Sequence, residues 1–326
     1  MECYPTIAVD SLLYHNVLDV LRELLHVEVN AGNERMFYGP QITVLNMHHK
    51  KEILSGQREY LVSPMGTGIR CLLIFVVIDA IPSVILLTRD LELYLVDLPY
   101  IAPSEVFEGT VIDGDICLAL DSVSNIETFD LYALAGACTT HKNLTFRRAL
   151  LNVVLQSLKF TGYKETNTLL LNVRPLFPLH EIHKALSMHP GQSILFVPVP
   201  DQVYFGRHPL LFKSGICTVD FLLRPTLKTR SGESYVRPFS EEPSSNANKW
   251  ELWCADGLLY NVVTFSSDQC ALFKSSSIWN FEFQSVHQWR PLKERRDLAD
   301  ANSLTMVLET INAAEYPVNP LTLETD

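Results

Sequence analysis

The chain has 326 residues, of which 47% are hydrophobic and 19% are charged. This composition excludes an intrinsically disordered protein, and the length suits two compact domains. The formal net charge of −11 argues against tight, non-specific binding of a polyanion through the whole surface, while leaving a local basic groove open.

Seven cysteines are spread along the chain without a C-x-x-C pair. Several lie in apolar runs, which predicts buried free thiols in a reducing compartment and no zinc site. The N-terminus lacks the basic and apolar regions of a secretory signal. The longest apolar runs, Cys71–Ile78 and Val84–Thr88, are too short to cross a bilayer. We therefore expect an intracellular protein without a membrane segment.

The first elements alternate between helix and strand patterns. A helix capped by Asp10 or Ser11 is predicted up to Leu25, because leucine and valine recur there at helical spacing. A turn and a short strand follow over Phe37–Asn46, and then a helix over Met47–Ser55. The two adjacent histidines of this second helix point in different directions, so they are poorly placed to chelate a metal.

The stretch Tyr60–Ile74, with the sequence YLVSPMGTGIRCLLI, is the most informative part of the chain. An apolar strand leads into a turn punctuated by Gly66 and Gly68, and a second apolar strand follows Arg70. Two buried strands hold such a loop rigidly, and its small residues let a ligand approach the backbone. The pattern indicates a binding loop.

Apolar runs separated by turn residues predict an antiparallel sheet after this loop, with strands at Cys71–Ile78, Val84–Leu87, Glu92–Asp97, Phe107–Leu120 and Thr128–Leu134. One of these runs contains VIDGDI, in which Asp113 and Asp115 lie two residues apart and hence on one face of a strand. Paired carboxylates suit a divalent metal or a sugar hydroxyl. The alternative is a hairpin turn on the surface.

The next predicted elements are helices at Leu144–Lys159 and Pro178–Met188 and strands at Thr168–Arg174, Ser193–Val199, Val203–Lys213 and Cys217–Leu223. The composition changes at Arg224, where we place a domain boundary. Lys228–Asn248 is polar and reads as a long exposed loop. Five short strands then suit a small barrel, and a final helix covers Asn302–Asn312: the strands are Trp250–Cys254, Leu258–Phe265, Gln269–Lys274, Ile278–Phe283 and Trp289–Leu292.

In this order the chain resembles the mRNA capping guanylyltransferase family. The segments that carry the resemblance are FYGPQITVLN, VSPMGTGIRCLLI, VIDGDI, TFDLYALAG with LTFRRAL, NVRPLFPLHEI, SILFVPV, LLFKSGICTVDFLL and WRPLKERRDLADANS. The resemblance implies an α+β fold. It consists of an antiparallel-sheet nucleotidyltransferase domain of the ATP-grasp or ligase-like kind over residues 1–223 and an OB-fold β-barrel over residues 224–326.

The chain departs from the family pattern where the family does its chemistry. A lysine of the family attacks the α-phosphate of GTP, which needs an amine with a lone pair. Met65 holds that position here, and a thioether cannot form the phosphoramidate. The other motif positions that depart from the pattern are Thr67, Pro190, Gln192, Ser193, Leu211 and Leu298. The resemblance therefore implies no catalytic residue and no metal ligand in this chain.

Other positions keep the residue type that the family uses for binding. By this resemblance, Arg70, Asp113, Asp115 and Phe129 would hold guanine and ribose, Lys213 and Arg295 would meet a phosphate, and Asp297 keeps part of the OB-domain motif. Stacking of a base on an aromatic ring contributes roughly 1–3 kcal/mol. We therefore expect that a pocket for a nucleoside or an RNA cap is retained although catalysis is lost. The alternative is that these residues only maintain the fold.

Three functions stay open at this point. The first is a pseudoenzyme that binds a guanine nucleotide or a capped RNA 5′ end, or that serves as a subunit in a capping or cap-recognition complex. The second is an active mRNA guanylyltransferase with an atypical nucleophile, which would use GTP and Mg²⁺. The third is a purely structural interaction module whose old cleft is filled. The family resemblance implies the nucleus, with the cytoplasm as the alternative, and a complete capping pathway would need partner chains.

Overall fold

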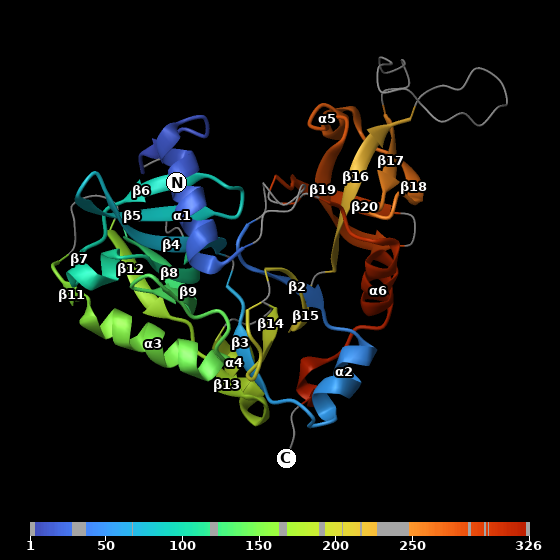
Figure 1. Cartoon of the computed structure of the whole chain (residues 1–326). Coiled ribbons are helices and arrows are strands. Elements are labelled where there is room, and N and C mark those ends of the chain that lie inside the picture. Colours follow the sequence, from blue (N-terminus) through green and yellow to red (C-terminus); the bar gives the residue numbers. More distant parts are fainter. Residues whose placement is uncertain are drawn as a thin grey trace. The chain divides into compact units, whose positions relative to one another are not determined.

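A computed structural model of the chain describes residues 4–27, 37–66, 68–117, 123–162, 168–188, 193–203, 205–215, 217–226, 248–285, 288–296, 298 and 300–323, with the backbone alone at 206–210 (Figure 1). The chain forms two compact units. One consists of Met1–Gly215 together with Val318–Asp326, and the other consists of Ile216–Pro317. Each unit has a hydrophobic core of its own.

The larger sheet of the first unit has the strand order β1-β6-β5-β4-β8-β9-β10, with β12 parallel to β9. All its other ladders are antiparallel. Its strands are β1 (Thr6–Ile7), β4 (Ile69–Ile78), β5 (Ile81–Thr88), β6 (Leu93–Val96), β8 (Thr110–Cys117), β9 (Val123–Leu134), β10 (Ala137–Cys138) and β12 (Thr168–Val173). A short two-stranded sheet joins β7 (Tyr100–Ile101) to β11 (Lys159–Phe160).

Helix α1 (Leu12–Leu25) covers one face of this sheet. It begins where the Ser11 side chain accepts a hydrogen bond from the Tyr14 amide, and it ends at His26, which takes a left-handed conformation. Its buried residues recur at helical spacing, as the sequence predicted. They pack on the strand residues Leu72 and Ile74 in a cluster that also includes Tyr14, Val17, Leu18, Leu21, Leu25, Ile85, Val111 and Tyr132.

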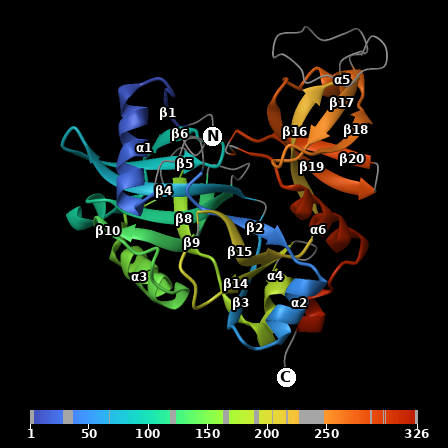
Figure 2. The same cartoon turned by 45° about the vertical axis from the view of Figure 1, so that its right-hand side comes forward.

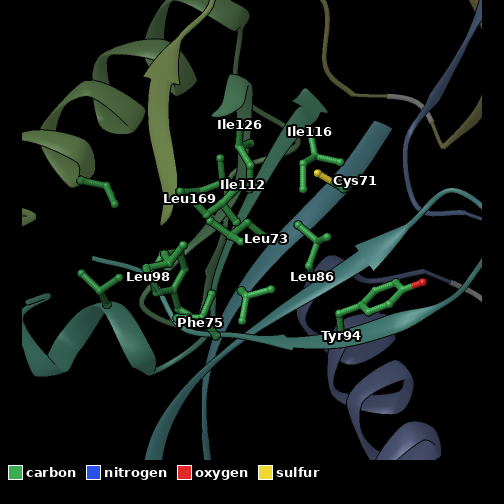
Figure 3. Close-up of a cluster of buried hydrophobic side chains, with 14 of the residues drawn as sticks. Cys71, Leu73, Phe75, Leu86, Tyr94, Leu98, Ile112, Ile116, Ile126 and Leu169 are labelled. Carbon is green, nitrogen blue, oxygen red and sulfur yellow. The ribbon is translucent and has the colours of Figure 1, made fainter. Parts of the chain in front are cut away.

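Helix α3 (Leu144–Ser157) covers the opposite face. Residues of β4 alternate between the two faces, so Leu73 and Phe75 join Leu151 of α3 in a second cluster (Figure 3). A sheet buried on both faces explains the continuous apolar run in the sequence. The predicted helix extended to Lys159, but α3 ends at Ser157 because Lys159 pairs with β7 as part of β11.

The second sheet of the first unit has the order β13-β3-β14-β15-β2. Its strands are β2 (Pro40–Val44), β3 (Tyr60–Pro64), β13 (Phe177–Pro178), β14 (Ile194–Pro198) and β15 (Gly206–Lys213). Helices α2 (Met47–Leu54) and α4 (Ile182–Met188) lie beside it (Figure 2). They pack on one of its faces with Val62, Phe196 and Phe212. A 3-10 turn, η2 (Leu179–Glu181), precedes α4, so the predicted helix from Pro178 starts as a tighter turn.

The second unit is a five-stranded antiparallel sheet in the order β18-β17-β16-β19-β20. Its strands are β16 (Thr218–Pro225), β17 (Lys249–Trp253), β18 (Leu259–Thr264), β19 (Ser277–Ser285) and β20 (Gln288–Glu294), and helix α6 (Leu304–Glu315) contributes Val307 to the core. No ladder among the described residues joins β18 to β20, so the predicted closed OB barrel stays a prediction. Strand β16 spans residues 223 and 224, where the sequence analysis placed the domain boundary.

One predicted strand of this unit is wrong. Gln269–Lys274 does not form a strand; residues Ser267–Cys270 form a short helix, α5. The Ser266 side chain accepts from the Gln269 amide while the Gln269 side chain accepts from the Ser266 amide, and this capping box favours a helix start over an extended chain. Most of the predicted loop Lys228–Asn248 lies outside the described residues.

Two further expectations concern cysteines and membranes. The described cysteines, Cys71, Cys117, Cys138, Cys217, Cys254 and Cys270, are free, and Cys71 and Cys254 are buried. Over the described ranges, no helix is both long and apolar enough to cross a membrane.

A 3-10 turn, η1 (Ser104–Phe107), precedes β8, which therefore starts later than predicted.

Candidate functional site

The glycine-punctuated loop joins β3 of the smaller sheet to β4 of the larger one. The Met65 amide donates to the Ser193 carbonyl at 2.9 Å, which ties the start of the loop to β14. A Cβ at Gly68 would come within 2.9 Å of Asp115 Cβ and of Cys117 Sγ on β8. Gly68 therefore has no room for a side chain, because the loop passes close to β8 at this position. Thr67, which lies between Gly66 and Gly68 in the sequence, is outside the described residues.

Arg70 and Asp113 form a two-bonded ion pair in this region. Arg70 Nε lies 3.0 Å from Asp113 Oδ1, and Arg70 Nη2 lies 2.6 Å from Oδ2. The Tyr132 hydroxyl donates to Asp113 Oδ2 at 2.6 Å, and Arg70 Nη1 donates to the Pro40 carbonyl at 2.7 Å. Asp113 is buried in the middle of β8, so VIDGDI is strand and not a surface hairpin.

Burial and charge act together on this network. Burial raises the pKa of the Tyr132 hydroxyl well above its ordinary value, and the adjacent Asp113 carboxylate raises it further. For Arg70, burial acts to lower the pKa, but the Asp113 carboxylate outweighs it and the pKa is raised. Tyr132 is therefore a neutral donor and Arg70 a permanent cation, and together they donate to both carboxylate oxygens of Asp113.

Asp115 lies on the same face of β8 as Asp113, as the two-residue spacing predicted, but it has a different partner. Its carboxylate accepts from Arg174 Nη2, and Arg174 Nε donates to Glu127 at 3.2 Å. The Arg174 guanidinium also lies over the Phe129 ring, 5.8 Å from its centre. One arginine thus links the second carboxylate to the aromatic residue that the resemblance assigns to guanine.

Phe129 is only 6% exposed and lies in an apolar cluster between the two sheets of the first unit. Leu195 and Val197 of β14, Leu211 of β15 and Leu144 of α3 surround it. Met65, Leu61, Ile42 and Leu176 pack against the same cluster. Met65 and Leu211, which the resemblance places where the family has lysines, therefore belong to the same apolar packing as the expected stacking ring.

Two more expected phosphate contacts lie in separate units. Lys213 is half-buried on β15, where its carbonyl accepts from the Leu45 amide at 2.7 Å. Arg295 belongs to the second unit, where its Nη1 lies 2.9 Å and 3.1 Å from the two carboxylate oxygens of Asp220. Asn280 also donates to Asp220 at 2.8 Å. Asp297, Pro190 and Gln192 lie outside the described residues.

The sequence analysis missed four residues of this site. Arg174 and Tyr132 contact the expected carboxylates, and Arg147 forms a buried pair with Asp130, with 2.7 Å between Nη2 and Oδ2. The neighbouring Arg148 donates to the Phe129 carbonyl at 2.8 Å, so α3 fixes the strand that carries the ring. The available signal was an arginine at the end of a buried strand and an arginine pair in an apolar helix, because charges there need partners.

The donor set offers little to a metal ion. Over the described residues, no group of three or more histidine, cysteine, aspartate or glutamate side chains could hold one. Asp113 and Asp115 each face an arginine. The carboxylates and arginines of this site pair with one another, Arg70 with Asp113 and Arg174 with Asp115. The apolar cluster around Phe129 lies beside them.

Comparison with known proteins decides the family. Residues 13–213, well over half of the chain, match the model of the mRNA capping enzyme catalytic domain. The chain belongs to the mRNA capping enzyme family. The predicted α+β fold with antiparallel nucleotidyltransferase sheets is thereby confirmed. As a family member it is a guanylyltransferase-like protein.

Solved structures similar to the chain are DNA ligases. A Lig E DNA ligase is 16% identical with a TM-score of 0.36, and the match covers 80% of this chain and 100% of that one. The ligase domain of M. tuberculosis LigD is 11% identical with a TM-score of 0.37 over 80% and 95% of the two chains. The Chlorella virus DNA ligase–adenylate is 13% identical with a TM-score of 0.34 over 80% and 98%. No curated protein sequence matches the chain.

Proposed function

We propose that this member of the capping enzyme family is catalytically inactive, with its nucleotide cleft filled, and serves as a non-catalytic subunit in a capping or cap-recognition complex. The observation that carries the proposal is the placement of Met65 and Leu211 against the buried Phe129. Both residues replace lysines of the family, and both pack into one apolar cluster.

The first step of the argument concerns the nucleophile. Guanylate transfer in the family goes through a lysine amine that attacks the α-phosphate, and a thioether has no equivalent reaction. The Met65 side chain is packed against the apolar cluster, and its amide is bonded to Ser193. Over the described residues, the cluster that Met65 packs against consists of apolar side chains, none of which is a nucleophile.

The second step concerns the base. Guanine would have to stack on Phe129, whose ring is 6% exposed. The Arg174 guanidinium lies over the ring, and the apolar cluster encloses the rest of it. A base could enter only by displacing these groups, and the lost packing would offset the roughly 1–3 kcal/mol that stacking contributes.

The third step concerns ribose, phosphate and metal. Asp113 and Asp115 hold arginines, so a sugar hydroxyl would have to compete with charged donors. The same pairing makes the two carboxylates poor ligands for Mg²⁺, which needs free carboxylate oxygens and near-octahedral geometry. The residues present do not fit the metal that a guanylyltransferase would use, and we derive no step through it.

The role that follows is structural. The protein would hold the family fold as a scaffold for protein partners that carry out capping, in the nucleus where the family's chemistry takes place. Contact with the RNA 5′ end would then come through the assembled complex. The net charge of −11 suits protein partners better than direct binding of a polyanion.

The test has two arms. The chain is first incubated with radiolabelled GTP and Mg²⁺ or Mn²⁺ beside an active guanylyltransferase, and no acid-labile adduct that resists SDS is expected on it. Guanosine nucleotides and cap analogues are then titrated by calorimetry, and no saturable binding is expected. A covalent adduct would establish the active enzyme instead. Guanine-specific binding at micromolar concentration, lost in Phe129→Ala, would establish a nucleotide-binding pseudoenzyme with an open pocket.

A further inference from the structure

A groove lies on the first unit away from the residues of the candidate site. Helix α1 forms one wall, and the end of β4 with the turn that leads into β5 forms the other. Phe107 of η1 and the two residues that follow it, Glu108 and Gly109, complete its lining. The hollow measures about 670 Å³ and shares no residue with the cluster around Phe129.

The walls of this groove expose apolar side chains to solvent. Leu12 is 76% exposed, Val20 is 46% exposed and Val77 is 53% exposed. Leu12, Asn16 and Val20 are spaced at i, i+4 and i+8, so they form a stripe along α1 that is more than two turns long. Asn16 is the polar member of this stripe, and exposed apolar side chains gathered around a hollow mark an interaction site more often than an ordinary solvated face does.

The polar rim of the groove carries a single sign of charge. Asp79 and Glu108 line it, and no lysine or arginine is found among its described lining residues. Glu23 continues the same side of α1 one turn beyond Val20 and is exposed. An apolar floor with an acidic rim is complementary to an apolar face flanked by basic side chains.

We propose that this groove binds an amphipathic, basic helix of a partner protein. The length of the stripe favours an elongated segment over a compact small molecule, and the walls formed by α1 and a strand end resemble the general helix-in-groove arrangement. Leucine-type side chains at helical spacing fill the hollow between Val20 and Val77, and lysine or arginine side chains on the flanks face Asp79 and Glu108. The inference does not depend on whether the nucleotide cleft is filled.

The probe for the test is a fluorescein-labelled peptide of about 15 residues, long enough for four helical turns. It carries leucine at positions i, i+3, i+4 and i+7 and lysine on both flanks, and its binding to the full chain is measured by fluorescence anisotropy. A matched peptide has glutamate in place of every lysine. We expect the glutamate peptide to bind at least about tenfold more weakly, because its charges oppose the acidic rim.

The variants separate this groove from other apolar surface. Val77→Lys should weaken binding of the lysine peptide by about tenfold or more, whereas Val153→Lys on α3 should leave it unchanged. Val153 is the matched control because it is a valine of similar exposure, at 59%, outside the groove. Asp79→Asn keeps a residue type that tolerates the left-handed backbone there, and it should weaken binding at low salt only.

Hydrogen exchange locates the bound peptide and decides between occupants. We expect protection of the chain at residues 12–20 and 76–79 in the presence of the lysine peptide. Equal binding of the two peptides, equal effects of Val77→Lys and Val153→Lys, or protection elsewhere would overturn the proposal. A dimer of the chain that dissociates in the Val77→Lys variant would also overturn it, because the groove would then bind a second copy.

Discussion

Arg70 on β4 and Asp113 on β8 are joined by two parallel hydrogen bonds, 3.0 Å from Nε to Oδ1 and 2.6 Å from Nη2 to Oδ2. The aspartate is 1% exposed and also accepts from Tyr132. The pair lies beside the loop that joins β3 to β4. Here the pair joins strands β4 and β8, since both carboxylate oxygens of Asp113 already accept hydrogen bonds from protein donors.

Asp113→Asn should destabilise the first unit strongly. The substitution leaves the Arg70 guanidinium largely buried without a counter-charge, and breaking a buried pair in this way costs roughly 3–5 kcal/mol. Denaturant unfolding followed by circular dichroism measures the change. Glu59→Gln, at an exposed position, is the control and should change stability by less than about 0.5 kcal/mol. Equal effects of the two substitutions would mean that the pair does not hold the strands.

Gly68→Ala should destabilise the protein while Gly66→Ala is tolerated. A Cβ at Gly68 would meet Asp115 Cβ and Cys117 Sγ at 2.9 Å, whereas the nearest atom to a Cβ at Gly66 is Glu127 Oε2 at 3.4 Å. Forcing an extra methyl into the closer contact costs roughly 1–3 kcal/mol. Thermal unfolding of both variants measures the difference, and identical midpoints would contradict the close approach of loop and strand.

Met65→Lys combined with Thr67→Asp should not restore guanylate transfer. The new lysine would enter the apolar cluster next to Leu211 and Phe129, and the positions Gln192, Leu211 and Leu298 would still lack the family's phosphate-side residues. The measurement is the radiolabelled GTP assay described above, with Met65→Leu as a control that keeps the cluster apolar. Detectable transfer by the double variant would show that the remaining machinery is intact.

The stability of the protein should fall between pH 10 and pH 12, in part through Tyr94. Burial, together with the hydrogen bond that its hydroxyl donates to Glu92 at 2.7 Å, raises the pKa of Tyr94 from 10.0 to about 12. Over this range the unfolded chain loses the proton and the folded chain keeps it, so rising pH favours unfolding. Below pH 10 the contribution of Tyr94 is fully present.

The variant Tyr94→Phe isolates this effect. It lacks the hydrogen bond to Glu92 and should be less stable than the wild type by about 1 kcal/mol at pH 8. The difference in free energy of unfolding should narrow as the pH rises from 10 to 12, because only the wild type has this hydroxyl to titrate. Tyr316→Phe, at a 63% exposed position, controls for the loss of one hydroxyl. A constant difference between wild type and Tyr94→Phe across the range would contradict the assignment.

Much of the fold could be predicted from the sequence because its signals are local. The spacing of leucine and valine up to Leu25 predicted α1, and the apolar run after Arg70 predicted β4. Asp113 and Asp115 were correctly assigned to one face from the period of a strand. The wrong strand at Gln269–Lys274 arose from the same local method, because its apolar residues outweighed the capping box of Ser266 and Gln269 in the pattern.

The sequence by itself determined the family and the order of most helices and strands, and its resemblance to the family places Met65 where the family has the nucleophilic lysine. Only the tertiary structure decided that Asp113 holds Arg70, that Asp115 holds Arg174, and that Met65 and Leu211 pack beside Phe129. The physical reason is the distance along the chain over which each kind of interaction acts. Residue type and periodicity act over a few neighbours, whereas the partner of a buried charge depends on strands and helices that are distant in the chain.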